Sequence, residues 1–143
     1  MEPLRIGIVG CGAISGIYLD NLGKFAQTEI VAVADLDQDR AKAVADRRGI
    51  AKALTTDALL SDPDVEFVLN LTVPKAHGSV AFAAIQAGKH VYNEKPLCIS
   101  NEDADRLVTS ADQANLKVGC APDTFLGAGH QTCRKLIDEG AIG

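Results

Sequence analysis

The stretch Ile6-Gly7-Ile8-Val9-Gly10-Cys11-Gly12-Ala13-Ile14-Ser15-Gly16 decides the fold. The apolar residues from Leu4 to Val9 predict a short buried strand, and the glycines that follow predict a tight turn. We expect a helix from about Gly12 to Lys24, with Ile14, Ile17 and Leu22 facing a sheet. A glycine-rich turn between a strand and a helix is the context in which a G-x-G-x-x-G pattern indicates a dinucleotide site.

Each small residue of this turn has a physical reason. Gly10 permits the sharp turn, and Gly12 has no Cβ, so its backbone can approach a pyrophosphate closely. The N–H groups of the new helix, beginning at Ala13 and Ile14, would face the phosphate charge together with the positive end of the helix dipole. Ser15 replaces the third glycine and is small enough for the helix to pack on the strand.

A second buried strand, Glu29–Asp35, ends in an acid about 20 residues after the glycine turn, the spacing expected for a carboxylate that binds the adenosine ribose. The alternatives for Asp35 are a solvated turn residue or the cap of the next helix. In the ribose role its carboxylate would accept both hydroxyls and repel a 2′-phosphate. Asp37 and Asp39 add negative charge, while Arg40 could partly offset a phosphate. We therefore predict NAD in preference to NADP.

Length and charge exclude several classes of protein. A length of 143 residues fits one domain, residues 1–143. With a net charge of −5 and scattered Lys and Arg, the sequence indicates no basic surface that would bind nucleic acid or a membrane. The first residues lead directly into the first strand, so we expect no signal peptide. The four cysteines have no metal-ligand spacing, which predicts reduced thiols, a cytoplasmic protein and no metal site. Cys11 is interpreted as a small filler of the turn rather than a nucleophile.

The rest of the chain alternates strands with helices. Further strands are predicted at 50–54, 66–71, 90–92 and 116–120. Helices are predicted from 36 to 49, from 56 to before Pro63, from Pro74 to Ala87, from Ser100 to 113, and from 126 to 139. This pattern predicts an α/β, doubly wound parallel-sheet Rossmann fold of three layers, α/β/α, with ligands at the carboxyl ends of the strands.

Several motifs together resemble the Gfo/Idh/MocA oxidoreductases. They are Val9-Gly10-Cys11-Gly12, Thr72-Val73-Pro74 with His77, Gly88-Lys89-His90-Val91, and Asn93-Glu94-Lys95-Pro96-Leu97. The resemblance covers essentially the whole chain, and the combination is specific although no single motif is. It implies an NAD(P)-dependent enzyme that transfers a hydride between nicotinamide and a sugar, cyclitol or related polyol.

The resemblance also implies roles for individual residues. Gly10, Gly12 and Ser15 would hold the pyrophosphate and Asp35 the adenosine ribose. Thr72, Val73 and Pro74 would pass beside the nicotinamide half, with His77 in the next helix turn, although a first-turn histidine is as often a capping neighbour. Glu94 would contact the nicotinamide ribose.

Lys95 is the predicted catalytic residue, next to the substrate oxygen. Hydride transfer moves charge onto or off that oxygen, which an ammonium can stabilise and protonate. The alternative is a surface lysine paired with Glu94.

The family implies a second α/β domain that supplies the substrate pocket, and we expect this domain to be absent from the 143 residues. The chain would then be the nucleotide-binding half of a longer enzyme, inactive alone, meeting a polyol or sugar substrate only through the missing domain and forming a homo-oligomer. Ala121–Phe125, where many relatives carry Asn or Arg, leaves the substrate class open. The alternatives are a non-catalytic dinucleotide-binding regulatory or sensor domain, and a Rossmann-like interaction domain that binds no dinucleotide.

Overall fold

The computed structural model describes residues 2–142 and contains a six-stranded parallel sheet with the strand order β3-β2-β1-β4-β5-β6. The strands are β1 (Leu4–Val9), β2 (Thr28–Ala34), β3 (Lys52–Leu54), β4 (Phe67–Asn70), β5 (His90–Asn93) and β6 (Val118–Cys120). After β3 at one edge, the chain crosses to the other side of β1 to form β4. The order of the strands therefore reverses between β1 and β4, and this is where open α/β sheets bind ligands.

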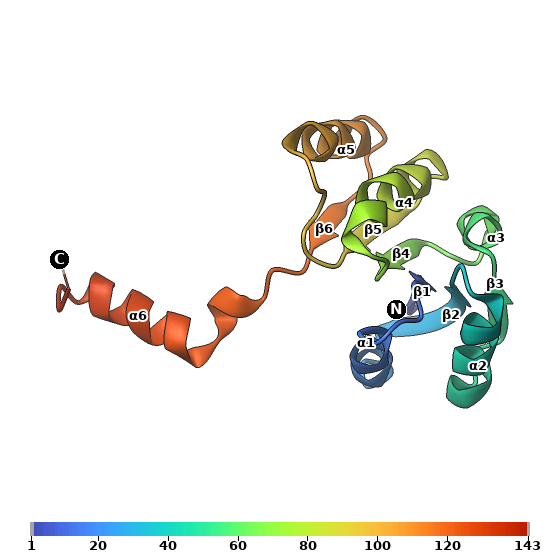
Figure 1. Cartoon of the computed structure of the whole chain (residues 1–143), viewed down its shortest axis with the longest axis horizontal. Coiled ribbons are helices and arrows are strands. Elements are labelled where there is room, and N and C mark those ends of the chain that lie inside the picture. The colour runs from blue at the N-terminus through green and yellow to red at the C-terminus, as the bar shows by residue number, and fades with distance from the viewer. Residues whose placement is uncertain (1, 143) are drawn as a thin grey trace.

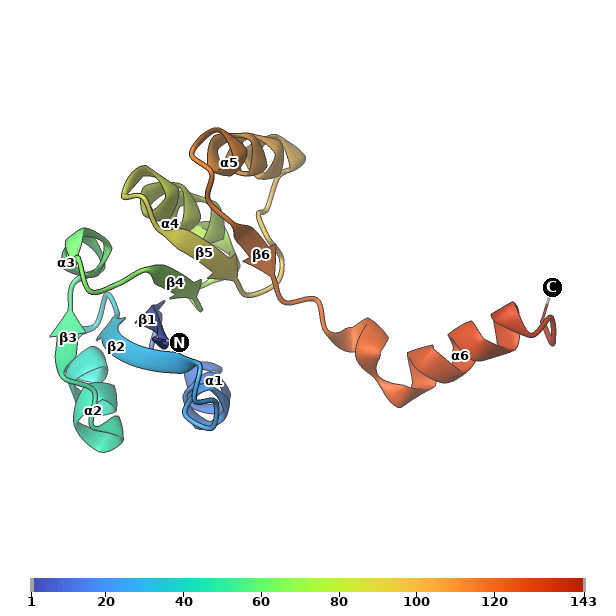
Figure 2. The same ribbon diagram turned by 180° about the vertical axis from the view of Figure 1, so that it is seen from behind.

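Helices cover both faces of the sheet (Figures 1 and 2). They are α1 (Ser15–Leu22), α2 (Gln38–Arg48), α3 (Thr56–Ser61), α4 (Pro74–Gln86), α5 (Asn101–Gln113) and α6 (Ala128–Asp138), with a 3-10 turn η1 (Thr124–Leu126). One apolar cluster joins α1 and α2 to the sheet, and a second joins α3, α4 and α5 to it. The predicted three-layer, doubly wound fold is confirmed.

Local sequence signals explain where the helices begin and end. Asp37 caps α2 by accepting a hydrogen bond from the Arg40 amide at 3.1 Å, and α2 ends at Gly49, which is left-handed with φ of 66°. The Ser100 hydroxyl caps α5 by accepting from the Asp103 amide at 3.1 Å, and it donates to the Asp103 carboxylate, whereas the reciprocal bond of a capping box would go to the Ser100 backbone amide. These side chains satisfy backbone groups that a helix end leaves unpaired.

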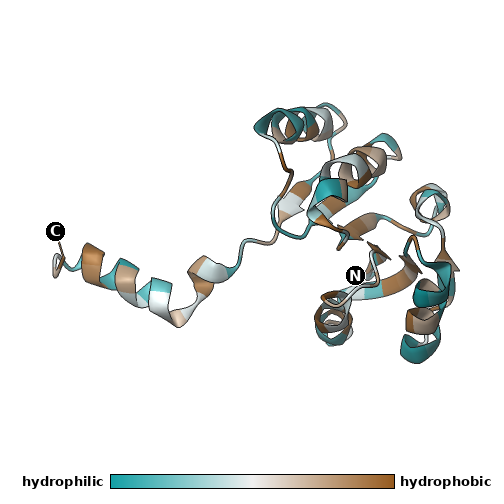
Figure 3. Ribbon diagram, in the orientation of Figure 1, coloured by the Kyte–Doolittle hydropathy of each residue, from teal (hydrophilic) through white to brown (hydrophobic). Residues whose placement is uncertain are grey.

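The core of the sheet is built almost entirely from small and branched apolar side chains (Figure 3). Ile8, Val33, Val68 and Val91 are at most 1% exposed. Strands buried on both faces are typical of parallel sheets covered by helices. The strands therefore provide a rigid platform whose carboxyl edge carries the loops.

The structure differs from the sequence prediction in α1. This helix begins at Ser15 rather than Gly12, because the Ser15 amide closes a turn on the Gly12 carbonyl at 3.1 Å. Ile14 and Ile17 were expected to face the sheet but are 44% and 57% exposed. The buried residues are Ser15 and, one helical turn later, Leu19.

The last helix, α6, lies away from the sheet (Figures 1 and 2). The segment predicted as one helix from residue 126 to 139 is a 3-10 turn followed by α6, and every residue of α6 is exposed. Leu136 and Ile137 are 39% and 55% exposed, and Leu126 and Ile142, just outside the helix, are also exposed. This apolar surface contributes nothing to the core of the domain.

Gly10 is the position at which the fold depends most on the absence of a side chain. Its φ is +104°, and a Cβ there would lie 2.6 Å from the backbone carbonyl of Leu71. We expect Gly10→Ala to lower the free energy of unfolding by about 3 kcal/mol or more, from backbone strain and overpacking together.

Gly49→Ala is the matched control for this measurement. Gly49 also has a positive φ but faces open space, so the change should cost only about 1–2 kcal/mol. Urea denaturation of both variants measures the difference, and equal losses would contradict the close approach at Gly10.

Candidate functional site

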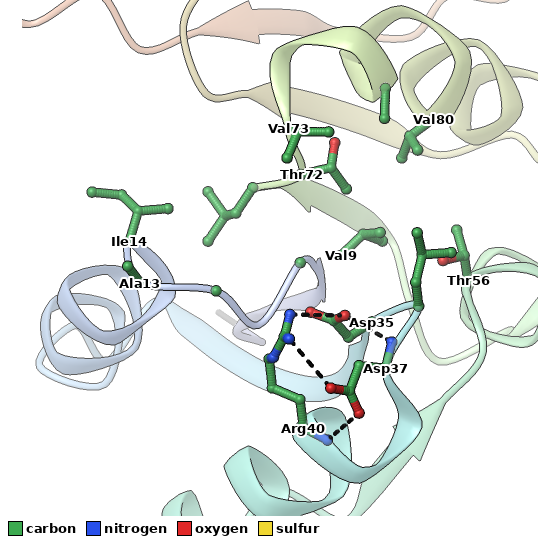
Figure 4. Close-up of a pocket in the computed structure, with 15 residues that line it drawn as sticks. Val9, Ala13, Ile14, Asp35, Asp37, Arg40, Thr56, Thr72, Val73 and Val80 are labelled. Carbon is green, nitrogen blue, oxygen red and sulfur yellow. Dashed lines mark hydrogen bonds and ion pairs between the residues drawn. The ribbon is translucent and has the colours of Figure 1, made fainter.

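A cavity of about 490 Å³ lies at the carboxyl edge of the sheet, where β1, β2 and β4 end (Figure 4). Its volume is within the range of small-molecule sites. It is lined by Val9, Gly10, Gly12, Ala13, Ile14, Asp35, Leu36, Asp37, Arg40, Thr56, Leu71, Thr72, Val73, Ala76 and Val80. The cavity thus coincides with the reversal of strand order.

The glycine turn forms one side of the cavity. The Gly10 amide donates to the Ala34 carbonyl at 2.8 Å, which fixes the turn against the end of β2. A Cβ on Gly12 would meet no atom within 4 Å, so the backbone here borders open space that a side chain would occupy. Gly12, Ala13 and Ile14 all line the cavity, as predicted for residues that meet a pyrophosphate.

Ser15 does not line this cavity. Its side chain is buried, with 3% exposure for the residue, and its hydroxyl donates to the Gly12 carbonyl at 2.7 Å. The Ser15 amide is also bonded to Gly12, so both polar groups are used within the turn. Both contacts of Ser15 therefore shape the turn.

The Asp35 carboxylate binds two backbone segments at once. One oxygen accepts from the Cys11 amide at 2.7 Å, and the other accepts from the Asp37 amide at 2.9 Å. Asp35 is 9% exposed and Asp37 caps α2, so Asp35 is neither a solvated turn residue nor the helix cap. Each carboxylate oxygen has two lone pairs, which leaves acceptor capacity at the cavity wall.

Arg40 lies beside this carboxylate (Figure 4). One guanidinium nitrogen, Nη1, lies 3.5 Å from Asp35 Oδ1, and the other, Nη2, lies 3.2 Å from Asp37 Oδ2. The arginine side chain is 50% exposed, so these ion pairs hold it weakly. The wall therefore carries two carboxylates and one movable cation.

A buried polar network supports the opposite wall, where Thr72 and Val73 line the cavity. Asn70 accepts a hydrogen bond from the Thr72 hydroxyl at 2.6 Å and donates to the Asn93 side chain at 3.0 Å. Asn70 and Asn93 are both fully buried, so their satisfied amides tie the end of β4 to the end of β5.

His77 belongs to this network rather than to the cavity wall. It is 1% exposed, and its ring nitrogens lie 2.5 Å from the Pro96 carbonyl and 3.0 Å from the Thr72 carbonyl. The sequence suggested contact with a cofactor or a capping role. The structure instead places the imidazole between the two loops that follow β4 and β5. Pro74, in the first turn of α4, is likewise outside the lining.

Glu94 and Lys95 follow β5 at the same edge of the sheet but do not line the cavity. The Glu94 carboxylate accepts from the Tyr18 hydroxyl at 2.7 Å and from the Lys95 amide at 2.8 Å. The Lys95 side chain is exposed, and its ammonium forms no ion pair within residues 2–142. Lys95 is therefore a surface lysine, as in the alternative interpretation, but its ammonium is not paired with Glu94 within the described residues.

Sequence reasoning missed part of the lining and the contact of Tyr18. Thr56 follows β3, so its place at the carboxyl end of a strand was a usable signal. Ala76 and Val80 lie four residues apart on α4, which puts them on one face. Tyr18 carried no signal, because its partner Glu94 is distant in sequence.

Residues 2–142 show neither a reactive thiol in the glycine turn nor a metal-binding cluster. Burial raises the pKa of the Cys11 thiol to about 11, so it is not a nucleophile at neutral pH. No cluster of potential metal ligands occurs between residues 2 and 142. None of the helices in that range has the length and apolar character needed to cross a membrane.

Comparison with known proteins agrees with this geometry. The model of a family described as an oxidoreductase family with an NAD-binding Rossmann fold, Gfo/Idh/MocA, matches residues 4–121. The chain belongs to this family. The resemblance inferred from the sequence motifs is therefore confirmed.

Among curated relatives, the chain is 34% identical over 140 residues to 1,5-anhydro-D-fructose reductase of Ensifer adhaerens, covering 97% of this chain and 42% of the reductase. It is 36% identical over 145 residues to inositol 2-dehydrogenase of Salmonella typhimurium, covering 98% and 43%. The chain thus spans less than half the length of these relatives.

Solved structures of the family share the fold. The K102E mutant of KijD10, a 3-ketoreductase from Actinomadura kijaniata in complex with TDP-benzene and NADP, superposes with a TM-score of 0.91 at 31% identity, covering 99% of this chain and 46% of that one. GenD2 from gentamicin A biosynthesis, in complex with NAD, gives 0.87 at 26% identity, covering 95% and 39%. Structural relatives therefore bind either NAD or NADP.

Proposed function

We propose that the chain is the nucleotide-binding half of an NAD(P)-dependent oxidoreductase that transfers a hydride between nicotinamide and a sugar, cyclitol or related polyol. The observation that carries the proposal is the cavity at the strand reversal, with the bare backbone of Gly12 on one side and the Asp35 carboxylate on another. A dinucleotide needs such close backbone approach for its pyrophosphate and an acid for its ribose.

The residues present fit each part of the dinucleotide. Gly12, Ala13 and Ile14 would meet the pyrophosphate, with Gly10 and Ser15 shaping the turn behind them. Asp35 would bind the adenosine ribose. Thr72 and Val73 would lie beside the nicotinamide half, supported by Pro74 and His77, and Glu94 would bind the nicotinamide ribose.

Lys95 is the proposed catalytic residue. The dinucleotide supplies the hydride acceptor or donor when it is bound. The free, exposed Lys95 ammonium would stabilise negative charge on the substrate oxygen and hold or deliver the proton that this oxygen loses or gains. The Glu94 carboxylate accepts a hydrogen bond from the Lys95 amide and would thereby hold the loop after β5 in place.

The substrate pocket belongs, in this proposal, to a second domain beyond residues 1–143. The curated relatives are more than twice as long as the matched region, and the exposed apolar residues of α6 would be covered by that domain. We further propose a cytoplasmic homo-oligomer. A non-catalytic sensor domain remains the second candidate, since the glycine turn and Asp35 alone would serve binding without Lys95.

Gly12→Val tests the dinucleotide site. A Cβ on residue 12 would meet no atom within 4 Å, so the variant should keep its free energy of unfolding within about 1 kcal/mol yet lose NADH binding, because the branched side chain blocks the pyrophosphate. Calorimetric titration measures binding. Gly129→Val, on the distant α6, is the control and should bind normally. If the Gly12→Val protein binds NADH as tightly as the parent chain does, Gly12 does not meet the pyrophosphate.

The wall around Asp35 predicts that NAD binds more tightly than NADP by roughly tenfold or more, since a close like-charge contact is worth a few kcal/mol at about 4 Å. Arg40→Ala should increase this preference, because it removes the cation that pairs with both carboxylates. Titration with each cofactor decides the matter, and equal or tighter NADP binding by the parent chain would contradict it.

Lys95→Ala in the full-length protein should lower turnover by roughly 10²-fold or more while the dissociation constant for NADH stays unchanged. Lys117→Ala is the matched control. This lysine is also exposed, but it precedes β6 and so lies at the amino-terminal ends of the strands, away from the carboxyl ends where Lys95 lies. Steady-state kinetics with a polyol substrate and cofactor titration give the two readouts. Unchanged turnover would favour a different role for the Glu94–Lys95 loop.

A further inference from the structure

Tyr18 connects two parts of the site that are far apart in the sequence. It lies on α1, the helix that follows the glycine turn, and its hydroxyl donates to the Glu94 carboxylate at 2.7 Å. Glu94 lies in the loop after β5. In the sheet, β4 and β1 separate β5 from β2. This is the only hydrogen bond within residues 2–142 between an α1 side chain and that loop.

Each oxygen of the Glu94 carboxylate accepts one hydrogen bond. Its second oxygen accepts from the Lys95 amide at 2.8 Å, and the Glu94 amide itself donates to the Asn70 carbonyl at 2.9 Å. Glu94 is half-buried, so the carboxylate is partly shielded from water. Since each oxygen can accept a second hydrogen bond, the carboxylate remains able to bind a ribose hydroxyl.

The environment keeps the Tyr18 hydroxyl protonated and therefore a donor. Burial raises the pKa of Tyr18, the hydrogen bond to Glu94 and its negative charge raise it further, and charge interactions with Tyr92 and Asp123 act in the same direction. A phenol that donates to a carboxylate forms one of the stronger classes of hydrogen bond. The ring itself packs in the apolar cluster that joins α1 and α2 to the sheet.

We infer that Tyr18 is a positioning residue: its hydroxyl holds the Glu94 carboxylate in place for the nicotinamide ribose, so that α1 serves both halves of the dinucleotide. The turn before α1, Gly12–Ile14, would meet the pyrophosphate, and Tyr18 would act on the other half through Glu94. This inference rests on the proposed function, because it assigns Glu94 to the cofactor. Tyr18 itself touches neither cofactor nor substrate.

The test compares NADH with ADP, which lacks the nicotinamide ribose and the nicotinamide, on Tyr18→Phe. The variant keeps the ring and its packing but removes the hydroxyl. NADH should bind about threefold to tenfold more weakly, whereas ADP should bind as it does to the parent chain. Equal weakening of both ligands would show a general disturbance of α1 and overturn the inference, as would unchanged NADH affinity.

Two further variants separate a positioning role from a general effect. Tyr92→Phe removes a neighbouring phenol whose hydroxyl has no hydrogen-bond partner within residues 2–142, and it should leave both affinities unchanged. Tyr18→Phe combined with Glu94→Ala should bind NADH no more weakly than Glu94→Ala alone, because Tyr18 acts only through Glu94. Additive losses would overturn the inference.

Hydrogen exchange of the Lys95 amide gives a readout that needs no ligand. This amide donates to the Glu94 carboxylate, so its exchange should accelerate in Tyr18→Phe and stay unchanged in Tyr92→Phe. If the parent chain binds neither ligand, the proposed function fails. Faster Lys95 exchange would then still show that Tyr18 positions Glu94, whereas unchanged exchange would overturn that as well.

Discussion

The hydrogen bond from the Cys11 amide to the Asp35 carboxylate is the interaction on which the site depends. It joins the turn after β1 to the end of β2 over 2.7 Å and is buried. The same carboxylate fixes the start of α2 through the Asp37 amide. A single acid thus fixes the glycine turn and lines the cavity, so its structural role and its proposed binding role rest on the same carboxylate.

The other half of the site is organised by buried polar side chains. Asn70 and Asn93 lie at the ends of β4 and β5 and His77 lies on α4, and the side-chain nitrogens of both asparagines donate to the His77 carbonyl. The His77 ring then spans the two loops that carry Thr72 and Pro96. Buried networks whose members are all satisfied are rigid, and no buried side-chain nitrogen or oxygen within residues 2–142 lacks a partner. This rigidity would hold Glu94 and Lys95 at a fixed place beside the cavity.

These two halves meet on α1. Its first residue, Ser15, is bonded to the glycine turn, and Tyr18 reaches the loop after β5. The exposed α6 stands in contrast, because it shares no contact surface with the sheet and carries apolar residues on its outside (Figure 1). The part of the chain that forms the site is therefore rigidly packed, whereas the last segment leaves apolar residues exposed.

The sequence by itself determined the strands, most helix ends, the layer order and the glycine turn. These features follow from local rules: apolar runs form buried strands, Asp37 and Ser100 cap helices, and Gly10 and Gly49 adopt positive φ. Only the tertiary structure decided that Ile14 and Ile17 face outward, that His77 joins two loops, and that Tyr18 reaches Glu94. Each of these depends on contacts between residues that are distant in the chain or on the exact residue at which α1 begins. No periodicity or spacing in a single sequence specifies such contacts, because they arise when the strands come together in the sheet.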